Sequence, residues 1–388
     1  MRPVDLFPSP HPTPSPHSAE DELAWLRLLR SHRVGISTFY KLIDAHGSAQ
    51  NALEALPEIA RSAGVKTYHP CPMAKAEEEI RQGAAAGAQL IFRGQADYPD
   101  TLSQIPDAPP FFWAMGDRAA LSRPMVALAG ARNASSLGLR MARKLAADLT
   151  KAGYVVVSGL ARGIDSAAHM AALEHGATIA VMPGGVDLIY PSENTDLAHR
   201  IAHHGLRISE QPIGRSPQAR HFPLRNRIIS GLSQAVIVVE AAAKSGTLIT
   251  ARNALDQGRE VLAVPGHPFD ARVAGCNMLI RDGAVLVRHS DDVFDALRGV
   301  FAQPPRPDSR QDAASEQGDP PAPKPARSLA DTTKLHDQIL ARLGPCPLAE
   351  DQLIRELGHP AQELSAEILT LEVEGRITRA AGGLLARS

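Results

Sequence analysis

The sequence of 388 residues has few of the features that assign a chain to a class at once. Aromatic residues make up only 4% of it, and its three cysteines (Cys71, Cys276 and Cys346) lie far apart. Without CxxC or zinc-type spacing they predict no disulfide framework and no metal site, and they are typical of a reduced, cytoplasmic chain. No apolar run approaches the ~20 residues of a membrane span, so we expect no membrane association. The formal net charge of −1 demands no anionic partner.

The motifs of common enzymes and nucleotide-binding proteins are also missing. The sequence has no GxxxxGK[ST], no HExxH and no GxSxG. The glycine-rich stretch GARNASSLG carries Arg132 where a dinucleotide-binding motif has its second glycine, and an arginine there would block the approach of a pyrophosphate. We therefore expect no catalytic residue, no metal and no cofactor, and predict that the protein is not an enzyme.

Short apolar runs that alternate with helical patterns dominate the middle of the chain. Strands that are apolar on both faces and alternate with helices predict a parallel sheet covered on both sides, an α/β Rossmann-like core. The runs occupy residues 125–130, 154–159, 178–185, 206–210, 235–240, 260–266 and 284–287. Ligands of such sheets bind at the carboxyl ends of the strands. The loops after Gly130, Gly159, Gly184 and Glu240 are thus expected on one rim.

The sequence predicts five segments. Residues 1–19 hold six prolines and no apolar segment, which is typical of a disordered tail rather than a signal peptide. Leucine spacing predicts a small helical module over 20–85, of SAM-like or helix-hairpin-helix-like type. The Rossmann-like core spans 86–300, and a linker with seven prolines spans 301–330. Three helical patterns followed by a hairpin pattern predict a winged-helix domain over 331–388.

Cations follow several of the predicted strands. Arg132 and Arg162 lie in loops that precede helices, where a phosphate would find both a guanidinium group and free amides. Lys244 begins a Lys-Ser-Gly-Thr turn before another helix, which is also a phosphate site by mechanism. Each has a plainer interpretation: Arg132 in an ion pair with a nearby acid, Arg162 as part of a tight turn, and Lys244 in a solvated, capped turn.

The stretch HFPLRNRIISG, residues 221–231, lies in a segment (211–239) with four arginines and no acid. Pro223 is expected to push Phe222 into an extended conformation, and Asn226 to cap the helix that follows. Arg225 and Arg227 would then lie near the positive end of that helix. In the alternative, Phe222 anchors the core and the arginines are solvated. Separated cations around an aromatic ring are typical of single-stranded nucleic acid binding, since cations follow the backbone and the ring stacks on a base.

Several long motifs resemble the DNA-processing protein A family, also called Smf. They are ALAGARNASSLG, VVSGLARGIDSAAHMAALEHGATIAVMPGGVDLIYPSEN, HFPLRNRIISGLSQAVIVVEAAAKSGTLITARNALDQGREVLAVPG and GCNMLIRDGAVLV, and the match covers roughly residues 90–295. The resemblance implies a Rossmann-like core that binds single-stranded DNA, forms a homodimer and loads the RecA recombinase during natural transformation. The single-strand site that we predict comprises Gly130, Arg132, Ser158, Gly159, Arg162, Gly163, Arg220, Phe222, Arg225, Asn226, Arg227, Lys244, Ser245, Gly246 and Thr247.

Two other hypotheses remain at this point. One is a nucleotide phosphoribohydrolase of the lysine-decarboxylase-like type, which shares a Rossmann core and the PGG sequence. Its continuation GTxxE is missing here, so Glu240 has no motif partner as a catalytic acid. The other is a structural scaffold, which leaves the acid-free run of arginines unexplained.

Overall fold

The computed structural model describes residues 15–298 and part of the C-terminal region, namely 335–336, 338–340, 343, 348–349, 353, 357, 364, 367–368, 371, 376–380 and 384–387. The chain divides into two compact units, Met1–Arg310 and Gln311–Ser388. Most of the predicted tail and the whole predicted linker lie outside the described residues. None of the helices within the described ranges is long and apolar enough to span a bilayer.

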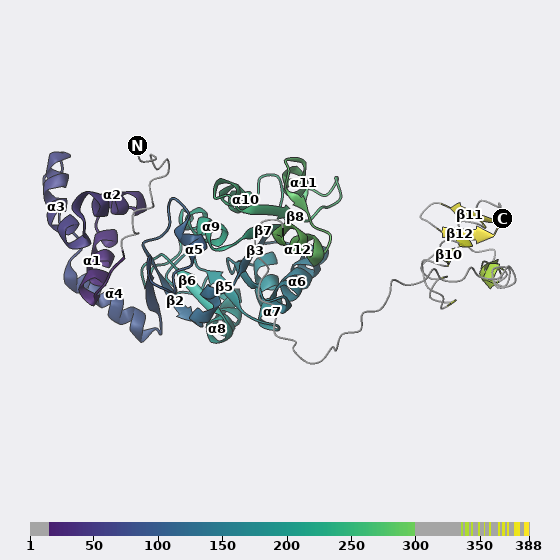
Figure 1. Cartoon of the computed structure of the whole chain (residues 1–388), viewed down its shortest axis with the longest axis horizontal. Coiled ribbons are helices and arrows are strands. Elements are labelled where there is room, and N and C mark those ends of the chain that lie inside the picture. Colours follow the sequence, from purple (N-terminus) through teal and green to yellow (C-terminus); the bar gives the residue numbers. More distant parts are fainter. Residues whose placement is uncertain are drawn as a thin grey trace, which may run out of the picture. The chain divides into compact units, whose positions relative to one another are not determined.

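A nine-stranded sheet forms the centre of the first unit, with the order β1-β2-β6-β5-β4-β3-β7-β8-β9 (Figure 1). The strands are β1 Gln89–Phe92, β2 Phe111–Gly116, β3 Met125–Gly130, β4 Val155–Ser158, β5 Thr178–Val181, β6 Leu206–Ser209, β7 Ala235–Glu240, β8 Glu260–Ala263 and β9 Val285–Leu286. Strands β3 to β9 are parallel and coincide with the seven predicted runs, which confirms the predicted sheet. The antiparallel strands β1 and β2, which the sequence analysis missed, extend it at one edge.

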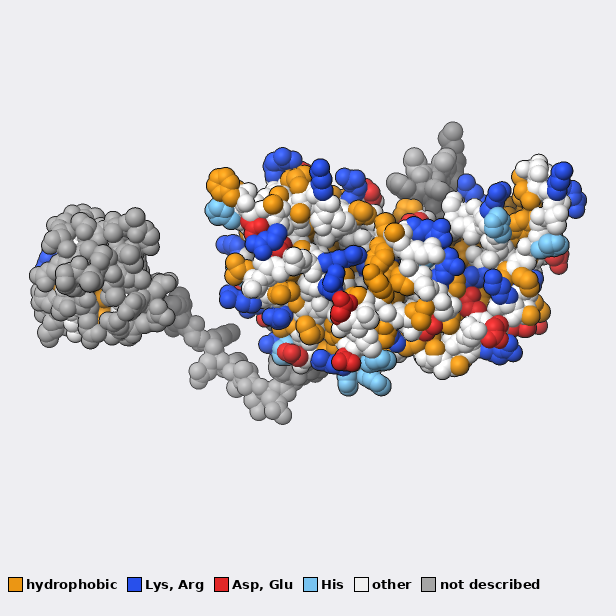
Figure 2. Space-filling model, turned by 180° about the vertical axis from the view of Figure 1, so that it is seen from behind, with side chains coloured by type: hydrophobic (Ala, Val, Ile, Leu, Met, Phe, Trp, Pro, Cys, Tyr) orange, Lys and Arg blue, Asp and Glu red, His pale blue; other side chains and the backbone are white. Residues whose placement is uncertain are grey.

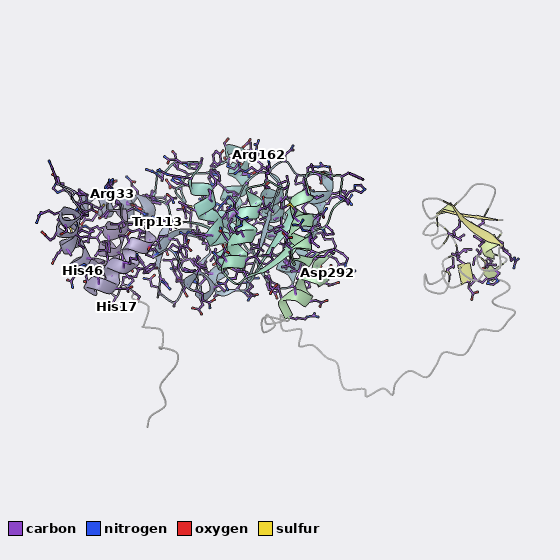
Figure 3. The ribbon with its side chains drawn as sticks, turned by 90° about the horizontal axis from the view of Figure 1, so that it is seen from above. His17, Arg33, His46, Trp113, Arg162 and Asp292 are labelled. Atoms are coloured by element: carbon purple, nitrogen blue, oxygen red, sulfur yellow. The ribbon has the colours of Figure 1, made fainter. Side chains whose placement is uncertain are left out.

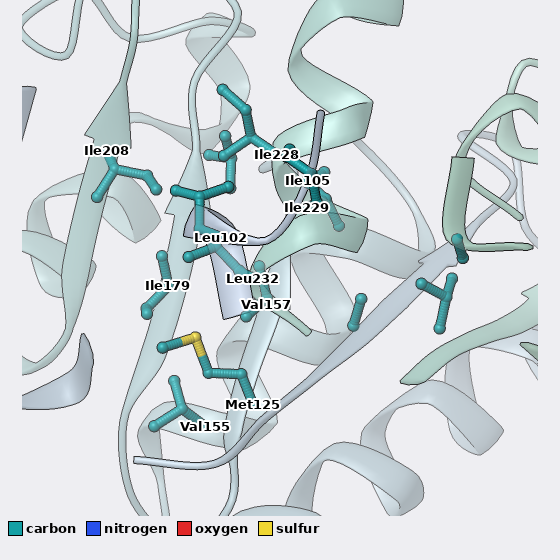
Figure 4. Close-up of a cluster of buried hydrophobic side chains, with 14 of the residues drawn as sticks. Leu102, Ile105, Met125, Val155, Val157, Ile179, Ile208, Ile228, Ile229 and Leu232 are labelled. Carbon is teal, nitrogen blue, oxygen red and sulfur yellow. The ribbon is translucent and has the colours of Figure 1, made fainter. Parts of the chain in front are cut away.

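Helices cover both faces of this sheet. On one face lie α6 Ser136–Lys151, α7 Ile164–Leu173, α8 Thr195–His204 and α12 Ser290–Arg298. On the other lie α5 Asp100–Ser103, α9 His221–Leu232, α10 Thr247–Asp256 and α11 Ala274–Arg281. Figure 4 shows the second face, where Leu102, Ile228 and Leu232 of the helices meet Val157 and Ile179 of the strands. A core of this kind needs few aromatic residues because branched aliphatic side chains fill both layers.

The order of the parallel strands creates a topological switch point. From β3 the chain proceeds outward through β4, β5 and β6 on one side, and then returns to place β7, β8 and β9 on the other. Strands β3 and β7 are neighbours, yet the loop after β3 leads to α6 on one face and the loop after β7 leads to α10 on the other. The two loops diverge, and a crevice opens between them at the carboxyl ends of the strands.

Four helices precede the sheet and pack against its antiparallel edge. They are α1 Ala19–Arg30, α2 Ile36–His46, α3 Ala49–Ser62 and α4 Met73–Ala85, and their apolar side chains share a cluster with Phe92 and Phe111 of β1 and β2. Trp113 of β2 lies in the interior (Figure 3). Its indole Nε1–H donates to Glu79 of α4 at 3.0 Å. The helical module and the core are therefore joined by a common apolar interior.

The second unit has its own apolar cluster, formed by leucines and isoleucines between Leu335 and Leu385. Its strands β10 Leu348–Ala349, β11 Ile377–Ala380 and β12 Leu384–Arg387 form an antiparallel sheet in the order β10-β12-β11. The pairing of β11 with β12 confirms the predicted hairpin, whereas its Gly-Gly turn lies outside the described residues. Helical residues with a small sheet agree with the winged helix predicted here.

Candidate nucleic-acid interface

A cleft of about 690 Å³ lies at the switch point, between the loops after β3 and β7 and the first turns of α9 and α10. We call it the switch-point cleft. Ten of the predicted residues line it: Gly130, Arg132, Ser158, Phe222, Arg225, Asn226, Lys244, Ser245, Gly246 and Thr247. Gly159 and Arg162 line a smaller neighbouring cleft of about 260 Å³, whereas Gly163, Arg220 and Arg227 line neither. Sequence segments more than a hundred residues apart thus meet at one rim, as predicted.

Phe222 and Arg132 lie at the boundary between the two clefts, and each of the two residues lines both clefts. The guanidinium carbon of Arg132 lies 5.2 Å from the centre of the Phe222 ring, a cation–π contact. Tyr190, which the sequence analysis did not select, meets the same ring edge-on at 5.8 Å. Phe222 is half-buried and Arg132 exposed, so neither is a core residue. The alternative of Phe222 as a core anchor is therefore wrong.

The exposed cations of the rim differ in their partners. Within the described residues, no carboxylate lies within ion-pair distance of Arg132 or Lys244. Arg162 faces Glu193 at 3.5 Å, and both side chains are more than half exposed. An exposed pair of this kind is weak and screened by salt. Figure 3 places Arg162 at the outer edge of the unit. Arg132 and Lys244 are the rim cations that remain available to an anion.

The turn before α10 ties the two diverging loops together. The hydroxyl of Thr247 donates to the carbonyl oxygen of Gly130 at 3.1 Å, across the switch point. The hydroxyl of Ser245 donates to Thr247 Oγ1 at 3.0 Å and accepts from the Thr247 amide at 3.2 Å. Both hydroxyls therefore shape the turn, as in the capped-turn interpretation. Lys244 is exposed beside the N-terminus of α10. The helix dipole and the ammonium group would both attract an anion at that point.

Arg225 lies beneath the cleft with its donors turned inward. Its Nη1 donates to the carbonyl oxygens of Gly159 at 2.5 Å and Val181 at 2.8 Å. A Cβ at Gly159 would overlap this guanidinium group, so the glycine is required by close approach. Burial lowers the pKa of Arg225 to about 10, and burial also raises the pKa of Asp165, whose charge attracts Arg225. The prediction of Arg225 as an exposed phosphate ligand is wrong because its side chain is buried and these carbonyl oxygens occupy Nη1.

Asp165 completes the support under the glycine-rich loop. Its Oδ2 accepts from the amides of Gly159 at 3.1 Å and Ala161 at 3.3 Å. His169, on the same helix, accepts from the Leu160 amide at 3.3 Å and contacts Thr178 Oγ1 at 2.7 Å. Burial lowers the pKa of His169 to about 3, so the buried ring is neutral. These side chains fix the loop after β4 from beneath. The outer edge of that loop lines the smaller cleft.

Arg227 belongs to a structural ion pair on the far side of α9. Its guanidinium group bonds to Glu210, donates to the Asp107 carbonyl oxygen at 2.6 Å and lies 3.3 Å from the Asp107 carboxylate. Its side chain is only 8% exposed. The predicted role of Arg227 as a phosphate ligand is therefore wrong, since two acids from outside the arginine-rich segment occupy it.

The helix that carries these arginines begins earlier than predicted. Helix α9 starts at His221, so Phe222 is helical rather than extended and Asn226 lies one turn inside instead of at the cap. Pro223 falls in the first turn, where its missing amide N–H costs no hydrogen bond. Asn226 accepts from Arg225 Nε at 3.2 Å and still lines the cleft. The proline begins this helix rather than delaying it.

Three other predicted residues have identifiable positions. Gly163 has a φ of 81° and lies against the carbonyl oxygen of Ala131, so its conformation shapes the loop that carries Arg132. The buried hydroxyl of Ser158 donates to the Leu128 carbonyl oxygen at 2.6 Å. Arg220 is exposed at the N-cap of α9, outside both clefts.

Glu240, the residue considered as a catalytic acid, is buried at the end of β7. Its carboxylate accepts from the Ser135 amide at 3.1 Å and from the Ser135 hydroxyl at 2.7 Å, at the N-terminus of α6. A Cβ at Gly138 would overlap it. The described residues contain no group of three or more side chains able to hold a metal ion. Glu240 thus holds Ser135, the N-cap residue of α6, in place.

The face in Figure 2 has no continuous basic field. Lys and Arg side chains are interspersed there with acidic and hydrophobic ones, as the net charge of −1 leads one to expect. Arg272, which the sequence analysis did not select, adds a cation to the switch-point cleft, although it is bonded to Asp270 at 2.7 Å. A signal for Tyr190 and Arg272 existed, since both follow predicted strands of the rim.

Comparison with known proteins gives the same family for each part of the chain. Residues 89–298 match the family DNA recombination-mediator protein A. Residues 19–82 match the DprA-like N-terminal HHH domain, and residues 322–383 match the DprA winged helix domain.

Individual relatives cover much of the chain. DNA processing protein DprA of Bacillus subtilis is 46% identical over 213 residues, which are 54% of this chain and 72% of the relative. Protein Smf of Synechocystis is 36% identical over 316 residues, 76% of this chain and 79% of the relative. The X-ray structure of DNA processing protein A from Streptococcus pneumoniae has a TM-score of 0.53 at 36% identity, covering 68% of this chain and 98% of that one.

A second solved structure is that of DNA processing protein A from Helicobacter pylori, which is described as giving insights into a unique single-stranded DNA binding mode. Its TM-score is 0.51 at 29% identity, covering 55% of this chain and 97% of that one.

Proposed function

Since the chain belongs to the DNA recombination-mediator protein A family, we propose that it binds single-stranded DNA in the switch-point cleft and delivers that DNA to the RecA recombinase during natural transformation. The single observation that carries the proposal is the half-buried ring of Phe222 beside the ion-pair-free Arg132 at the carboxyl ends of the central strands. A ring next to a phosphate-binding cation is the arrangement that holds a base and its backbone together.

Single strands fit this arrangement better than duplexes. A stacking ring needs the face of an unpaired base, which a duplex keeps inside its own stack. Arg132 and Lys244 reach the cleft from different loops, those after β3 and β7, and so offer two separate cations to one backbone. The relative from Helicobacter pylori, described by its single-stranded DNA binding mode, supports the same class of ligand.

We propose a mediator rather than an enzyme, and we place it in the cytoplasm. Glu240, the acid that a phosphoribohydrolase would need, is committed to the N-terminus of α6. Cys71 and Cys276 are buried free thiols, as expected for a reducing compartment. No observation favours the hydrolase. That this protein does not hydrolyse nucleotides stays a prediction.

The test compares affinity for oligo-dT with affinity for the matching duplex across a range of salt. We expect preference for the single strand, and a log–log salt slope that rises by ~0.7 for each phosphate neutralised. Arg132→Ala should weaken binding by about 1.5–3 kcal/mol, the value of a charge-assisted hydrogen bond. Arg143→Ala is the matched control because Arg143 is exposed on α6 and lines neither cleft. Equal affinity for both forms of DNA, or a flat salt response, would refute the proposal.

Delivery to RecA is tested separately. Purified protein should speed the assembly of RecA on a single strand already coated by single-strand-binding protein, as read from the DNA-dependent ATPase activity of RecA. The Arg132→Ala variant should lose most of this effect together with its DNA binding. Normal strand binding without any stimulation of RecA would leave a DNA-binding protein that is not a mediator.

The homodimer is also part of the proposal. Strand β9 is the last in the described sheet, and Val285 and Leu286 on it are more than one-third exposed, as is Met278 on the adjacent α11. An open edge with apolar side chains is suited to a second copy of the chain. Light scattering should give twice the chain mass of 41.4 kDa for the native protein and the mass of one chain for Leu286→Lys. Ile59→Lys, at an exposed apolar position of α3, is the control.

A further inference from the structure

The loop between β8 and α11, residues 264–273, separates the switch-point cleft from another cleft. Arg272 of this loop lines the switch-point cleft. On its other side, Val264 to His267, Asp270 and Val273 line a cleft of about 570 Å³, which is completed by the first turns of α6 and by Arg288. We call this second space the α6 cleft. One loop therefore borders both.

The α6 cleft has apolar walls and a cationic rim. Its walls include Val239, Val264 and Val287. At the rim, Leu137 is 70% exposed, and Arg140 has no ion pair within the described residues. Lys144 and Arg288 also border the cleft but are bonded to Asp148 and Asp292. Two acids line the cleft. Asp270 is paired with Arg272, whereas Glu240 is buried and accepts from the neutral Ser135. A phosphate would therefore lie at the rim beside Arg140 and not against Glu240.

Phe269 projects from the dividing loop into solvent, with its side chain 95% exposed. The loop that carries it is well defined by hydrogen bonds. The Phe269 amide donates to His267 Nδ1 at 3.3 Å, the Asp270 amide donates to the His267 carbonyl oxygen at 2.9 Å, and the Gly266 amide donates to Asn277 at 3.1 Å. The ring of His267 lies 5.6 Å from that of Phe269. An aromatic ring is thus held outward on a structured turn, three residues before Arg272 in the sequence.

A strand of more than a few nucleotides must extend beyond the switch-point cleft. A cleft of about 690 Å³ has the size of a site for one small ligand, so it holds only a few nucleotides. Phe222 and the smaller cleft border it on one side, and Arg272 and the dividing loop border it on another. A bound strand would leave the cleft past these residues. The second exit also has an aromatic residue and an arginine, Phe269 and Arg272, which are three positions apart on one loop.

We propose that Phe269 is a second base-stacking position and that the α6 cleft binds the nucleotides of single-stranded DNA that follow it. The inference rests on the proposed function, because it extends the same strand beyond the switch-point cleft. Single-stranded DNA is favoured over a protein partner because the dividing loop is continuous with the first cleft and adds a cation to it. Phe269 and Arg140 therefore determine how many nucleotides one chain covers.

The experiment compares a short oligo-dT of about six nucleotides with a long one of about 24 nucleotides. Phe269→Ala should weaken binding of the long strand about fivefold to a hundredfold, the loss of one stacked base, and leave the short strand unchanged. Phe222→Ala should weaken both. Leu255→Ala is the control, since Leu255 is exposed and apolar but lines neither cleft. Because Phe269 is exposed, its replacement leaves the fold intact.

A second readout locates the contact directly. A long strand with 5-iodouracil at successive positions should cross-link to the peptide 267–273 at some positions and not at others, and Phe269→Ala should remove that cross-link. An unchanged affinity of Phe269→Ala for the long strand overturns the inference, as does an equal loss for short and long strands. If the native protein binds neither strand, the proposed function itself fails, and that outcome is distinct from both.

Discussion

Replacing Arg225 by methionine tests whether this arginine stabilises the fold or binds DNA. Methionine keeps much of the volume and removes the charge, so Asp165 stays buried without its cationic neighbour. A buried carboxylate that loses a compensating charge is destabilised by at most about 3–5 kcal/mol, the value for a direct buried ion pair. The lost hydrogen bonds to Gly159 and Val181 are part of that cost, since bonds from charged donors contribute about 1.5–3 kcal/mol each. A loss of this size is a large fraction of the ~5–15 kcal/mol that stabilises a folded domain.

The two tryptophans provide the assay. Trp25 and Trp113 both lie in the first compact unit, so the change in their fluorescence during urea unfolding reports on that unit alone. We expect a lower urea midpoint for Arg225→Met, and a partial recovery in the double variant with Asp165→Asn, which removes the unpaired charge and keeps an oxygen for the loop amides. At low temperature, where the single variant is folded, oligo-dT affinity should stay within a few-fold of the native value. A native midpoint together with a loss of affinity would show that Arg225 is a DNA ligand after all.

Three further expectations follow from the same geometry. Phe222→Ala should weaken single-strand binding by ~1–3 kcal/mol in a titration, with a loss of stability well below the ~3–5 kcal/mol of a core phenylalanine, because its ring is only half-buried; a loss of the full core size with normal binding of the folded variant would contradict this. His169 has a pKa of about 3 in the folded protein and near 6.5 in the unfolded chain. Its contribution to the free energy of unfolding is therefore complete above pH 6.5 and is lost as the pH falls toward 3, by at most about 1.4 kcal/mol per pH unit. His169→Gln should flatten the pH dependence of the urea midpoint between pH 7 and about 4.5, and parallel curves for the two proteins would refute the assignment. Truncation after residue 300 should leave oligo-dT affinity within a few-fold, because every residue of the switch-point cleft lies between Ala129 and Arg272; a large loss would place part of the site in the second unit.

The sheet was predictable because its signal is local. A buried parallel strand is apolar on both faces, and runs such as AVIVVE are continuous in the sequence. The order of the strands also brought the predicted loops to one rim, since all carboxyl ends of parallel strands point the same way. Strand β2 was missed because FFWAMG follows a proline-containing segment and pairs antiparallel, outside the alternation of strand and helix.

The roles of the arginines were not predictable for the opposite reason. The segment 211–239 contains no acid, yet Arg227 is paired with Asp107 and Glu210, and Arg225 faces Asp165. These partners come from other parts of the chain, and only the packing of α9 on the sheet brings them close. Local charge therefore predicted solvent-facing cations where tertiary contacts bury them. Arg132 differs because its loop projects beyond the end of β3.

The contact of Glu240 with Ser135, the N-cap residue of α6, has a consequence for which nucleotides the protein can bind. In dinucleotide-binding Rossmann folds, the N-terminus of the helix after the first strand of the parallel sheet receives the pyrophosphate of the cofactor. Here the chain's own carboxylate occupies that end of α6, bound to the Ser135 amide and hydroxyl. A free dinucleotide would have to displace a buried negative charge to enter. We therefore expect dinucleotide cofactors not to compete for this crevice, which favours a ligand that binds farther out along the rim.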